Sequence, residues 1–452
     1  MNSRLAILLM LAALARAGAS DDIRGILVNR VDQKKAVGII VATIDAHGRN
    51  IIPYGTVAKD RSDAPDGNTV FEIGSVTKVF TSLLLADMVE RGEVRLDEPV
   101  ADLLPKSAKV PSHNGRQITL LDLSMQSSGL PRLPTNAQPA DFMNPYADYT
   151  PAKLYEFLSG YTLTRDPGEQ YEYSNLGAGL LGHALALKAG VSYEELLRKR
   201  ILDPLGMRDT SITLTADQKK RLAAGYNAAL EPVSNWTFDA LAGCGALHST
   251  ANDLLVFLAA NMELTDTPLK AAMRRMRSIR KPTGMPDLDI AMAWHVLTKF
   301  GGEIVWHNGG TYGYRSFIGF DPVAKKGVVV LCNTFMDNDD VGLHALDSRY
   351  PVARFSTKRE RVAIAADPEI LKRYVGEYRL TPTFAIKITL EGNHLVAQAT
   401  NQPAFEIFEE KENEFFLKAV DAQITFTVDS SGRPTSMVLH QNGHDMTAPK
   451  IN

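Results

Sequence analysis

The sequence predicts an α/β fold: an antiparallel sheet flanked by helices carries an inserted helical domain, and a small all-β, barrel-like domain follows. Strand patterns lie near residues 38–57 and 303–332, helical patterns fill most of the chain between them, and short alternating segments follow residue 361. The simplest arrangement is one sheet that contains the strands near 38–57 together with those near 303–332, with the helical insert beside it. We expect a functional site in the cleft between sheet and insert.

The length and composition are those of a globular protein with two or three domains. The 452 residues exceed one ordinary hydrophobic core, and 45% of them are hydrophobic and 22% charged. The formal net charge of -3 gives no reason to expect nucleic acid or an anionic membrane surface as a partner.

The first residues have the pattern of an export signal. Arg4 precedes the apolar run Leu5–Leu14, and Ala17-Gly-Ala19 offers small residues for cleavage. A buried first helix or an uncleaved anchor is the alternative, but this run is short of the roughly 20 residues that span a bilayer. We predict a signal peptide over residues 1–19, a periplasmic or secreted mature chain, and no later membrane span.

The first domain, predicted over residues 20–360, opens with a β-hairpin at 38–57, where β-branched and apolar side chains flank an Asp-Ala-His-Gly turn. A helix is predicted from Ser75 to about Arg91, because apolar side chains recur there at helical spacing and Gly92 can end it. The clearest later helices are predicted at 175–189 and 251–261, and the clearest later strands at 303–306, 314–320 and 327–332.

The second domain, predicted over residues 361–452, begins after a charged boundary at 358–361. Its alternating segments are separated by turn signals such as Glu391-Gly-Asn and Ser431-Gly-Arg-Pro, which is the spacing of a small barrel or sandwich. The predicted strands lie at 384–390, 394–399, 414–417 and 424–428.

The first candidate for chemistry is the pair Ser75 and Lys78. A serine hydroxyl needs a partner that takes its proton, and a lysine three residues along a helix lies on the same face. Burial favours the neutral amine, which can act as that base, and the helix N-terminus favours a developing oxyanion. The motif alone is weak, because a second copy, Ser278-Ile-Arg-Lys281, is interpreted as a solvated helix face.

The second candidate is Tyr173-Ser174-Asn175, which opens a predicted helix. Tyr173 can relay a proton between nucleophile, lysine and leaving group, and Asn175 can hydrogen-bond a substrate amide. The structural alternative is that Ser174 or Asn175 only caps the helix while Tyr173 packs.

The third candidate is His307-Asn308-Gly309-Gly310 at the end of a strand. The two glycines allow a close approach of backbone and ligand, and the N–H groups of Gly310 and Ser75 can form an oxyanion hole. A lone histidine before a glycine-rich turn is more often structural, so His307 gains weight only from the other motifs.

Together these motifs resemble those of the serine β-lactamase and penicillin-binding protein superfamily, above all class C β-lactamases, S12-type peptidases and class C-like esterases. The family order of Ser-x-x-Lys, Tyr-x-Asn and Lys/His-x-Gly is matched at 75–78, 173–175 and 307–309. Framework stretches such as 92–105, 118–131 and 204–207 are also similar, over roughly residues 25 to 345. The tail from Tyr374 resembles the small lipocalin-like domains of some S12 relatives.

The resemblance implies a serine hydrolase that acts through an acyl-enzyme on amide, lactam or ester bonds. Ser75 would be the nucleophile, Lys78 and Tyr173 would share the base and acid duties, and Asn175 would bind the acyl-side amide. His307, Gly309 and Gly310 complete the implied substrate-binding set. β-Lactams and short peptides, including those with D-residues, are the first substrate classes; a carboxylesterase and a non-turning-over penicillin-binding sensor are the alternatives.

Two departures from the family pattern affect these expectations. Class C β-lactamases have Lys-Thr-Gly in the third motif, where this chain has His307 and Asn308. Protonation of His307, near pH 6.5 if unperturbed, would then tune carboxylate binding, which would weaken as the pH rises. Cys244 stands where relatives often have glycine.

Other classes of enzyme fit poorly. The sequence lacks a Gly-x-Ser-x-Gly elbow, a zinc-type histidine spacing and a nucleotide-binding glycine motif, so we expect no metal and no cofactor. Cys244 and Cys332 are interpreted as buried free thiols, with a disulfide between them as the alternative. The expected partner is a small-molecule or peptide substrate.

Overall fold

The computed structural model describes residues 20–355, 361, 363–364, 367–381, 384–400, 402, 404–418, 422–441 and 444–451. The predicted signal peptide at 1–19 lies outside the described residues. The chain divides into two compact units, which meet in sequence between Val352 and Ala353.

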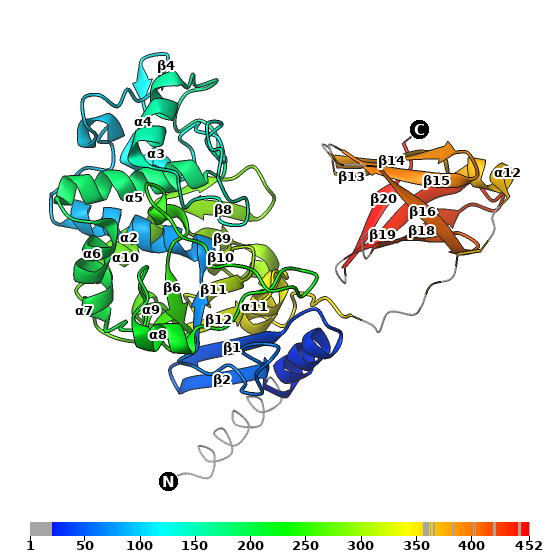
Figure 1. The fold of residues 1–452 in the computed structure, drawn as a ribbon, viewed down its shortest axis with the longest axis horizontal. Helices are drawn as coiled ribbons and strands as arrows, with labels where there is room; N and C mark the ends of the chain where they lie inside the picture. The colour runs from blue at the N-terminus through cyan, green and yellow to red at the C-terminus, as the bar shows by residue number, and fades with distance from the viewer. Residues whose placement is uncertain are drawn as a thin grey trace, which may run out of the picture. The chain divides into compact units, whose positions relative to one another are not determined.

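The first unit is built on an eight-stranded antiparallel sheet in the order β2-β1-β12-β11-β10-β9-β8-β7 (Figure 1). Strand β1 pairs with β12, with Ile39 opposite Cys332, so the N-terminal hairpin and the late strands share one sheet, as predicted. The strands are β1 (Gly38–Asp45), β2 (Gly48–Gly55), β7 (Arg280–Pro282), β8 (Leu288–Ala291), β9 (His295–Leu297), β10 (Ile304–Gly310), β11 (Arg315–Asp321) and β12 (Lys326–Cys332).

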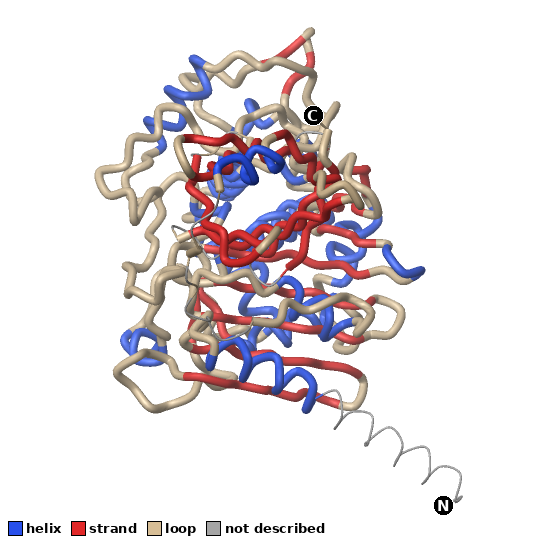
Figure 2. The backbone as a smooth tube through the Cα atoms, turned by 90° about the vertical axis from the view of Figure 1, so that its right-hand side faces the viewer, coloured by secondary structure: helices blue, strands red, loops and turns tan. Residues whose placement is uncertain are grey.

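Helices cover both faces of this sheet (Figures 1 and 2). One core joins α2 (Thr77–Glu90), α9 (Ala251–Asn261) and α10 (Lys270–Ser278) to one face of the sheet. A second core joins a helix at residues 20–32 and α11 (Asp339–Leu346) to the other face. The predicted α/β class is confirmed, and both faces of the sheet are buried because apolar side chains follow one another without interruption along much of β1 and β12.

The helical insert lies between β2 and β7. It contains α3 (Leu120–Ser124), α4 (Pro151–Gly160), α5 (Asn175–Ala189), α6 (Tyr193–Leu197), α7 (Asp203–Leu205) and α8 (Ala216–Arg221). Single turns η2 (Val100–Leu103), η3 (Arg198–Leu202) and η4 (Ala242–Cys244), and the short pairs β3 (Val70–Glu72) with β6 (His248–Thr250) and β4 (Ser112–His113) with β5 (Arg116–Gln117), complete it.

One sequence interpretation in this region is wrong. Ser278 is the last residue of α10, and Lys281 lies in β7, so the second Ser-x-x-Lys does not lie on one helix face. Its serine and lysine are separated by the helix end and cannot repeat the geometry of a helical i, i+3 pair.

The second unit is an eight-stranded antiparallel sheet in the order β13 to β20, curled into a barrel-like ring (Figure 2). The ends approach one another through a bridge between Tyr378 and Lys450, and its own apolar core includes Tyr378, Phe415 and Phe426. Its elements are α12 (Pro368–Leu371), η6 (Lys372–Tyr374), β13 (Gly376–Thr381), β14 (Phe384–Glu391), β15 (His394–Ala399), β16 (Ala404–Lys411), β17 (Glu414–Leu417), β18 (Ala422–Val428), β19 (Pro434–Gln441) and β20 (His444–Pro449). The predicted all-β tail is therefore confirmed.

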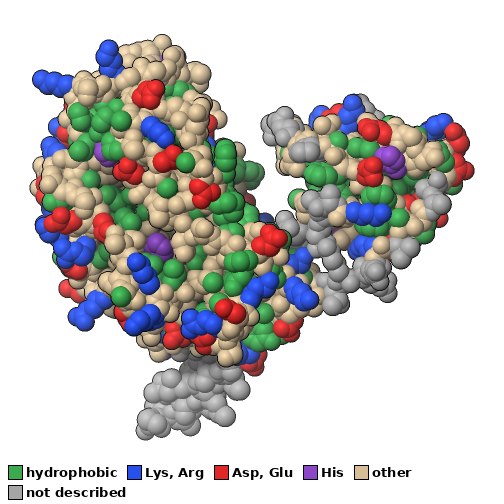
Figure 3. All heavy atoms as spheres, viewed as in Figure 1, with side chains coloured by type: hydrophobic (Ala, Val, Ile, Leu, Met, Phe, Trp, Pro, Cys, Tyr) green, Lys and Arg blue, Asp and Glu red, His purple; other side chains and the backbone are tan. Residues whose placement is uncertain are grey.

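Charged side chains of both signs are mixed over the face drawn in Figure 3, in keeping with the small net charge. Within the described residues, no helix combines the length and apolar character needed to cross a membrane.

Candidate active site

Ser75 lies in a tight turn between the sheet and helix α2. Strand β3 leads into the single turn η1 (Gly74–Val76), and α2 begins at Thr77, two residues later than predicted. Gly74 has φ of +47°, a conformation that side-chain-bearing residues rarely adopt. The turn therefore presents Ser75 at the entrance of helix α2.

Lys78 lies beside Ser75, as the motif predicts. Its Nζ is 2.9 Å from Ser75 Oγ and donates to the carbonyl oxygen of Cys244 at 2.7 Å. The lysine is only 1% exposed, although it carries a titratable group. A buried amine held against a serine hydroxyl is the arrangement that proton transfer from that hydroxyl requires.

Tyr173 lies at the start of α5, close to the same lysine. Lys78 Nζ is 4.8 Å from the centroid of the Tyr173 ring. Ser174 is the N-cap of α5, because its hydroxyl accepts from Gly177 N, and its own N–H donates to Gln126 Oε1. The capping interpretation of this motif is thus correct for Ser174, and the cap also fixes the positions of Tyr173 and Asn175 at the start of α5.

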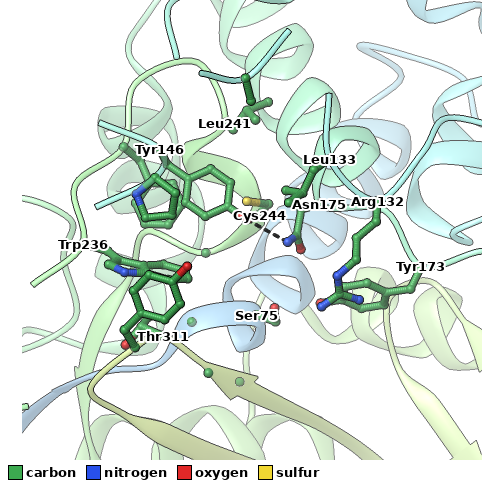
Figure 4. Close-up of a pocket in the computed structure, with 18 of the residues that line it drawn as sticks. Ser75, Arg132, Leu133, Tyr146, Tyr173, Asn175, Trp236, Leu241, Cys244 and Thr311 are labelled. Carbon is green, nitrogen blue, oxygen red and sulfur yellow. Dashed lines mark hydrogen bonds between the residues drawn. The ribbon is translucent and has the colours of Figure 1, made fainter. Parts of the chain in front are cut away.

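Asn175 projects into the same pocket (Figure 4). Its Nδ2 donates to the Tyr146 hydroxyl at 2.9 Å, while its Oδ1 is buried without a hydrogen-bond partner. An orphaned buried acceptor costs free energy, which a substrate N–H can recover.

The glycines of β10 allow a close approach between two parts of the protein itself. A Cβ on Gly309 would lie 1.9 Å from the Ile73 carbonyl oxygen, and Ser316 Oγ donates to that oxygen at 2.8 Å. A Cβ on Gly74 would lie 2.7 Å from Gly310 N. The glycines therefore let the strand pack against the turn that carries Ser75, a reason that differs from the ligand contact we expected, and they bring Gly310 close to Gly74.

His307 lies behind the pocket and is only 1% exposed. Its ring stacks on His295, with centroids 5.2 Å apart, and its Nδ1 contacts the Asn308 carbonyl oxygen. Burial, His295 and Lys78 hold the pKa of His307 well below its usual range, so the expected titration near pH 6.5 is wrong. Its proposed role in substrate binding stays a prediction.

The other third-motif side chain is also engaged. Asn308 Nδ2 donates to Asp339 Oδ2, at the first turn of α11. Burial and the neighbouring Asp337 raise the pKa of the Asp339 carboxyl to about 8. The Asn308 amide and the protonated Asp339 carboxyl are therefore both uncharged near neutral pH.

A pocket of about 800 Å³ is bordered by Ser75, Tyr173, Asn175, Gly309 and Gly310. Figure 4 shows Tyr146 and Trp236 on one side of Ser75 and Arg132 with Tyr173 on the other. The aromatic side is continuous, because Tyr146 stacks on Phe238 at 4.7 Å and Trp236 contacts Tyr312 at 5.0 Å between centroids.

Sequence reasoning missed these walls. The aromatic residues lie in long loops with no periodicity, so no local pattern marks them. For Arg132, its position directly after the family-like stretch 118–131 was a signal from which the sequence could have predicted a place near the site.

Neither cysteine competes with Ser75. Both are free and buried, as interpreted, and burial raises the pKa of the Cys244 thiol to about 11, which keeps it protonated. Among the described residues, no group of three or more histidine, cysteine or acidic side chains is placed to hold a metal ion.

Residues 23–348 match the Beta-lactamase family. The chain belongs to the β-lactamase family. Residues 360–450 match a family described as a domain of unknown function, DUF3471. The resemblance to the serine β-lactamase and penicillin-binding protein superfamily is thereby confirmed.

Individual relatives within the β-lactamase family match over different lengths. The chain is 35% identical over 222 residues to the D-alanyl-D-alanine-carboxypeptidase/endopeptidase AmpH of Escherichia coli, which covers 49% of this chain and 56% of AmpH. It is 26% identical over 416 residues to penicillin-binding protein 4* of Bacillus subtilis, covering 84% and 87% of the two chains. The segment matched to AmpH thus spans little more than half of that relative.

Solved structures of β-lactamase-family proteins share the fold. A β-lactamase/D-alanine carboxypeptidase from Yersinia pestis, complexed with citrate, aligns at TM-score 0.65 and 26% identity over 75% of this chain and 97% of that one. A class C β-lactamase aligns at TM-score 0.64 and 24% identity, over 73% and 96%.

Proposed function

We propose that the protein is a serine hydrolase that cleaves amide, lactam or ester bonds through an acyl-enzyme on Ser75. The observation that carries the proposal is the 2.9 Å contact between Lys78 Nζ and Ser75 Oγ at the edge of an 800 Å³ pocket. Membership of the β-lactamase family supports the same chemistry.

The reaction has two balanced halves. Ser75 Oγ attacks the substrate carbonyl carbon while its proton passes to Lys78 and Tyr173, which return a proton to the leaving group as the C–N or C–O bond breaks. Water then attacks the serine ester, one proton returns to Ser75 Oγ, and the acid is released. The N–H groups of Ser75 and Gly310 stabilise the oxyanion in both halves.

Within this chemistry, we favour peptides, including those with D-residues, over β-lactams. A β-lactamase that depends on a cation in the third motif would not find one here, because His307 is held neutral and Asn308 contacts Asp339. The carboxypeptidase named among the relatives supports a peptide substrate.

The second candidate is a carboxylesterase, favoured by the aromatic wall around Tyr146 and Trp236, which suits an apolar acyl group. A sensor that acylates without turnover uses the same first half-reaction. It differs only in the rate of deacylation.

The proposal includes export with cleavage after residue 19, a hydrolase domain over 20–360 and an accessory domain over 361–452. The pattern of residues 1–19 supports the first part, and two separate hydrophobic cores support the division. N-terminal sequencing of the protein isolated from its source should give Ser20 or a nearby residue, and an intact Met1 would contradict export with cleavage.

The decisive experiment is a turnover panel with nitrocefin, p-nitrophenyl butyrate and D-alanyl p-nitroanilide. Ser75→Ala should abolish turnover of every active substrate and labelling by a fluorophosphonate or fluorescent penicillin. Ser278→Ala, which changes the exposed serine of the second Ser-x-x-Lys, is the matched control and should behave like wild type. Equal labelling of Ser75→Ala and wild type would contradict the proposal, and a burst without turnover would identify a sensor.

A further inference from the structure

Two arginines, Arg132 and Arg315, line the pocket. They are notable because the histidines beside the pocket are neutral: burial lowers the pKa of His295 to about 4 and holds the pKa of His307 well below its usual range. The cationic side chains near the pocket are therefore these two arginines and Lys78, and Lys78 already contacts Ser75 and the Cys244 carbonyl oxygen.

Arg315 belongs to the side of the pocket formed by the sheet. It pairs across the strands with Gly310, its guanidinium lies 4.1 Å from the centroid of the Phe335 ring, and its charge acts on Asp339. Its side chain is half-buried and packs so closely on Gly310 that a Cβ there would lie 2.7 Å from its guanidinium, so Arg315 is less accessible to a substrate carboxylate than the exposed Arg132.

Arg132 is held next to the second motif instead. Its carbonyl oxygen accepts from Asn175 N at 3.0 Å, and the preceding Pro131 carbonyl accepts from Ser174 Oγ at 2.7 Å. Its guanidinium lies 4.9 Å from the centroid of the Tyr173 ring. Figure 4 shows the two side chains side by side. Its side chain is exposed, and it forms no ion pair with a carboxylate of the described part of the chain.

We infer that Arg132 is the specificity residue that binds a carboxylate on the leaving-group half of the substrate. The inference rests on the proposed function, in which Tyr173 returns a proton to the leaving group. A substrate group that binds Arg132 over the Tyr173 ring is therefore attached to the leaving atom. The acyl half of the substrate extends past Asn175 toward Tyr146 and Trp236, on the opposite side of Ser75 (Figure 4).

The geometry suits a carboxylate for two further reasons. A guanidinium offers a planar fork of donors that matches carboxylate oxygens, and stacking on an aromatic ring leaves that fork free at its edge. In this inference Arg132, in the loop before α5, takes the place of the cation that relatives carry in the third motif. The substrate class is an acylated amino acid or peptide whose leaving residue bears a free carboxylate.

The test uses two esters with one acyl group and two leaving groups: the phenylacetylglycyl esters of 3-hydroxybenzoate and of 3-hydroxybenzamide. They differ in the charge of the leaving group and form the same acyl-enzyme. Wild type should prefer the benzoate in kcat/KM, and added NaCl should reduce that preference. Arg132→Gln should lower the benzoate-to-benzamide ratio by about tenfold or more, the loss expected for a charged hydrogen bond.

The controls separate this inference from the proposed function. Arg132→Lys should keep part of the preference, Arg315→Gln should keep the ratio near that of wild type, and the deacylation rate must be equal for the two esters in each variant. A ratio unchanged in Arg132→Gln, or lowered only in Arg315→Gln, would overturn the assignment of Arg132 while leaving the proposed function intact. Failure of both esters to acylate Ser75 would overturn both.

Discussion

The imidazole rings of His295 and His307 stack with their centroids 5.2 Å apart and an interplanar angle of 17°. Both rings are buried, and Lys78 adds a third basic group close to them. Protonation of either ring is opposed by desolvation and by the charge of Lys78, and protonation of His307 also by His295, so both rings are neutral near neutral pH. The third motif therefore contributes shape and neutral hydrogen-bonding capacity to the pocket.

The first prediction concerns stability in acid. A histidine whose folded pKa is depressed stabilises the fold above its unfolded pKa of about 6.5, and that stability is lost as the pH falls toward its folded value. For His295, a pKa of about 4 corresponds to about 3 kcal/mol lost across this range. Urea unfolding from pH 7.5 to 4.5 should show a steep loss in wild type, a shallower one in His295→Phe, and a wild-type slope in the exposed control His47→Gln. Equal slopes in wild type and His295→Phe would contradict the prediction.

The second prediction concerns the proton path. Lys78→Ala and Tyr173→Phe should each lower the acylation rate by about 10²–10⁴-fold, the usual contribution of a general acid–base group. Because the two residues act as one unit, the double variant should lose much less than the product of the single losses. Stopped-flow acylation measures this, with circular dichroism to check folding. Fully multiplicative losses would show two independent roles.

The third prediction concerns Gly309. Alanine there places a methyl group 1.9 Å from the Ile73 carbonyl oxygen, so β10 and the nucleophile turn must separate. Gly309→Ala should lower acylation by at least about tenfold and also lower the melting temperature. Gly302→Ala, before the same strand, has no atom within 4 Å of the added carbon and should be close to wild type in both measurements. Normal acylation in Gly309→Ala would show that the turn does not depend on this contact.

The fourth prediction concerns Asp339, whose folded pKa is raised to about 8. The folded state keeps this proton at pH values where the unfolded chain has released it, so Asp339 makes the fold less stable as the pH rises from about 4 to 8. Asp339→Asn, which cannot ionise, should gain about 1 kcal/mol or more at pH 8 relative to wild type and little at pH 4. Asp97→Asn, at an 83% exposed side chain, is the control for a general charge effect. A gain independent of pH would contradict the assigned cause.

The fifth prediction concerns the tail. The hydrophobic cores of the first unit contain residues up to Tyr350, and the core of the second unit begins at Leu371. A chain truncated after Val352 should therefore fold and still be labelled at Ser75 by a fluorophosphonate. An insoluble or unfolded product, measured by circular dichroism and gel filtration, would show that the tail belongs to the main fold.

Sequence reasoning was most accurate where the signals are local. Helix α5 covers Asn175–Ala189 as predicted, because Ser174 caps its first turn and Gly190 ends it with φ of +69°. The strands of both units were predicted in the same local way, from apolar or alternating runs bounded by turn residues. The pairing of β1 with β12 could also be inferred, because the apolar runs at both ends need a common core.

Three features of the site could not be derived this way, because each depends on contacts distant in sequence. The burial of His307 follows from its packing against His295 and Tyr173. The need for glycine at position 309 follows from Ile73, and the position of Arg132 over Tyr173 follows from the cap of α5. A one-dimensional pattern identifies such residues as candidates but does not give the direction of their side chains.

The turn that carries Ser75 rests on the sheet, through Gly309, Ser316 and the Ile73 carbonyl oxygen, whereas much of the opposite wall, including Arg132, Tyr146 and Trp236, comes from loops of the helical insert. Mutations in those loops can therefore accumulate while the reacting serine keeps its position. Evolution can in this way change what the enzyme accepts separately from how it reacts, and laboratory selection for a new substrate should find its beneficial substitutions among residues 132–149 and 233–245.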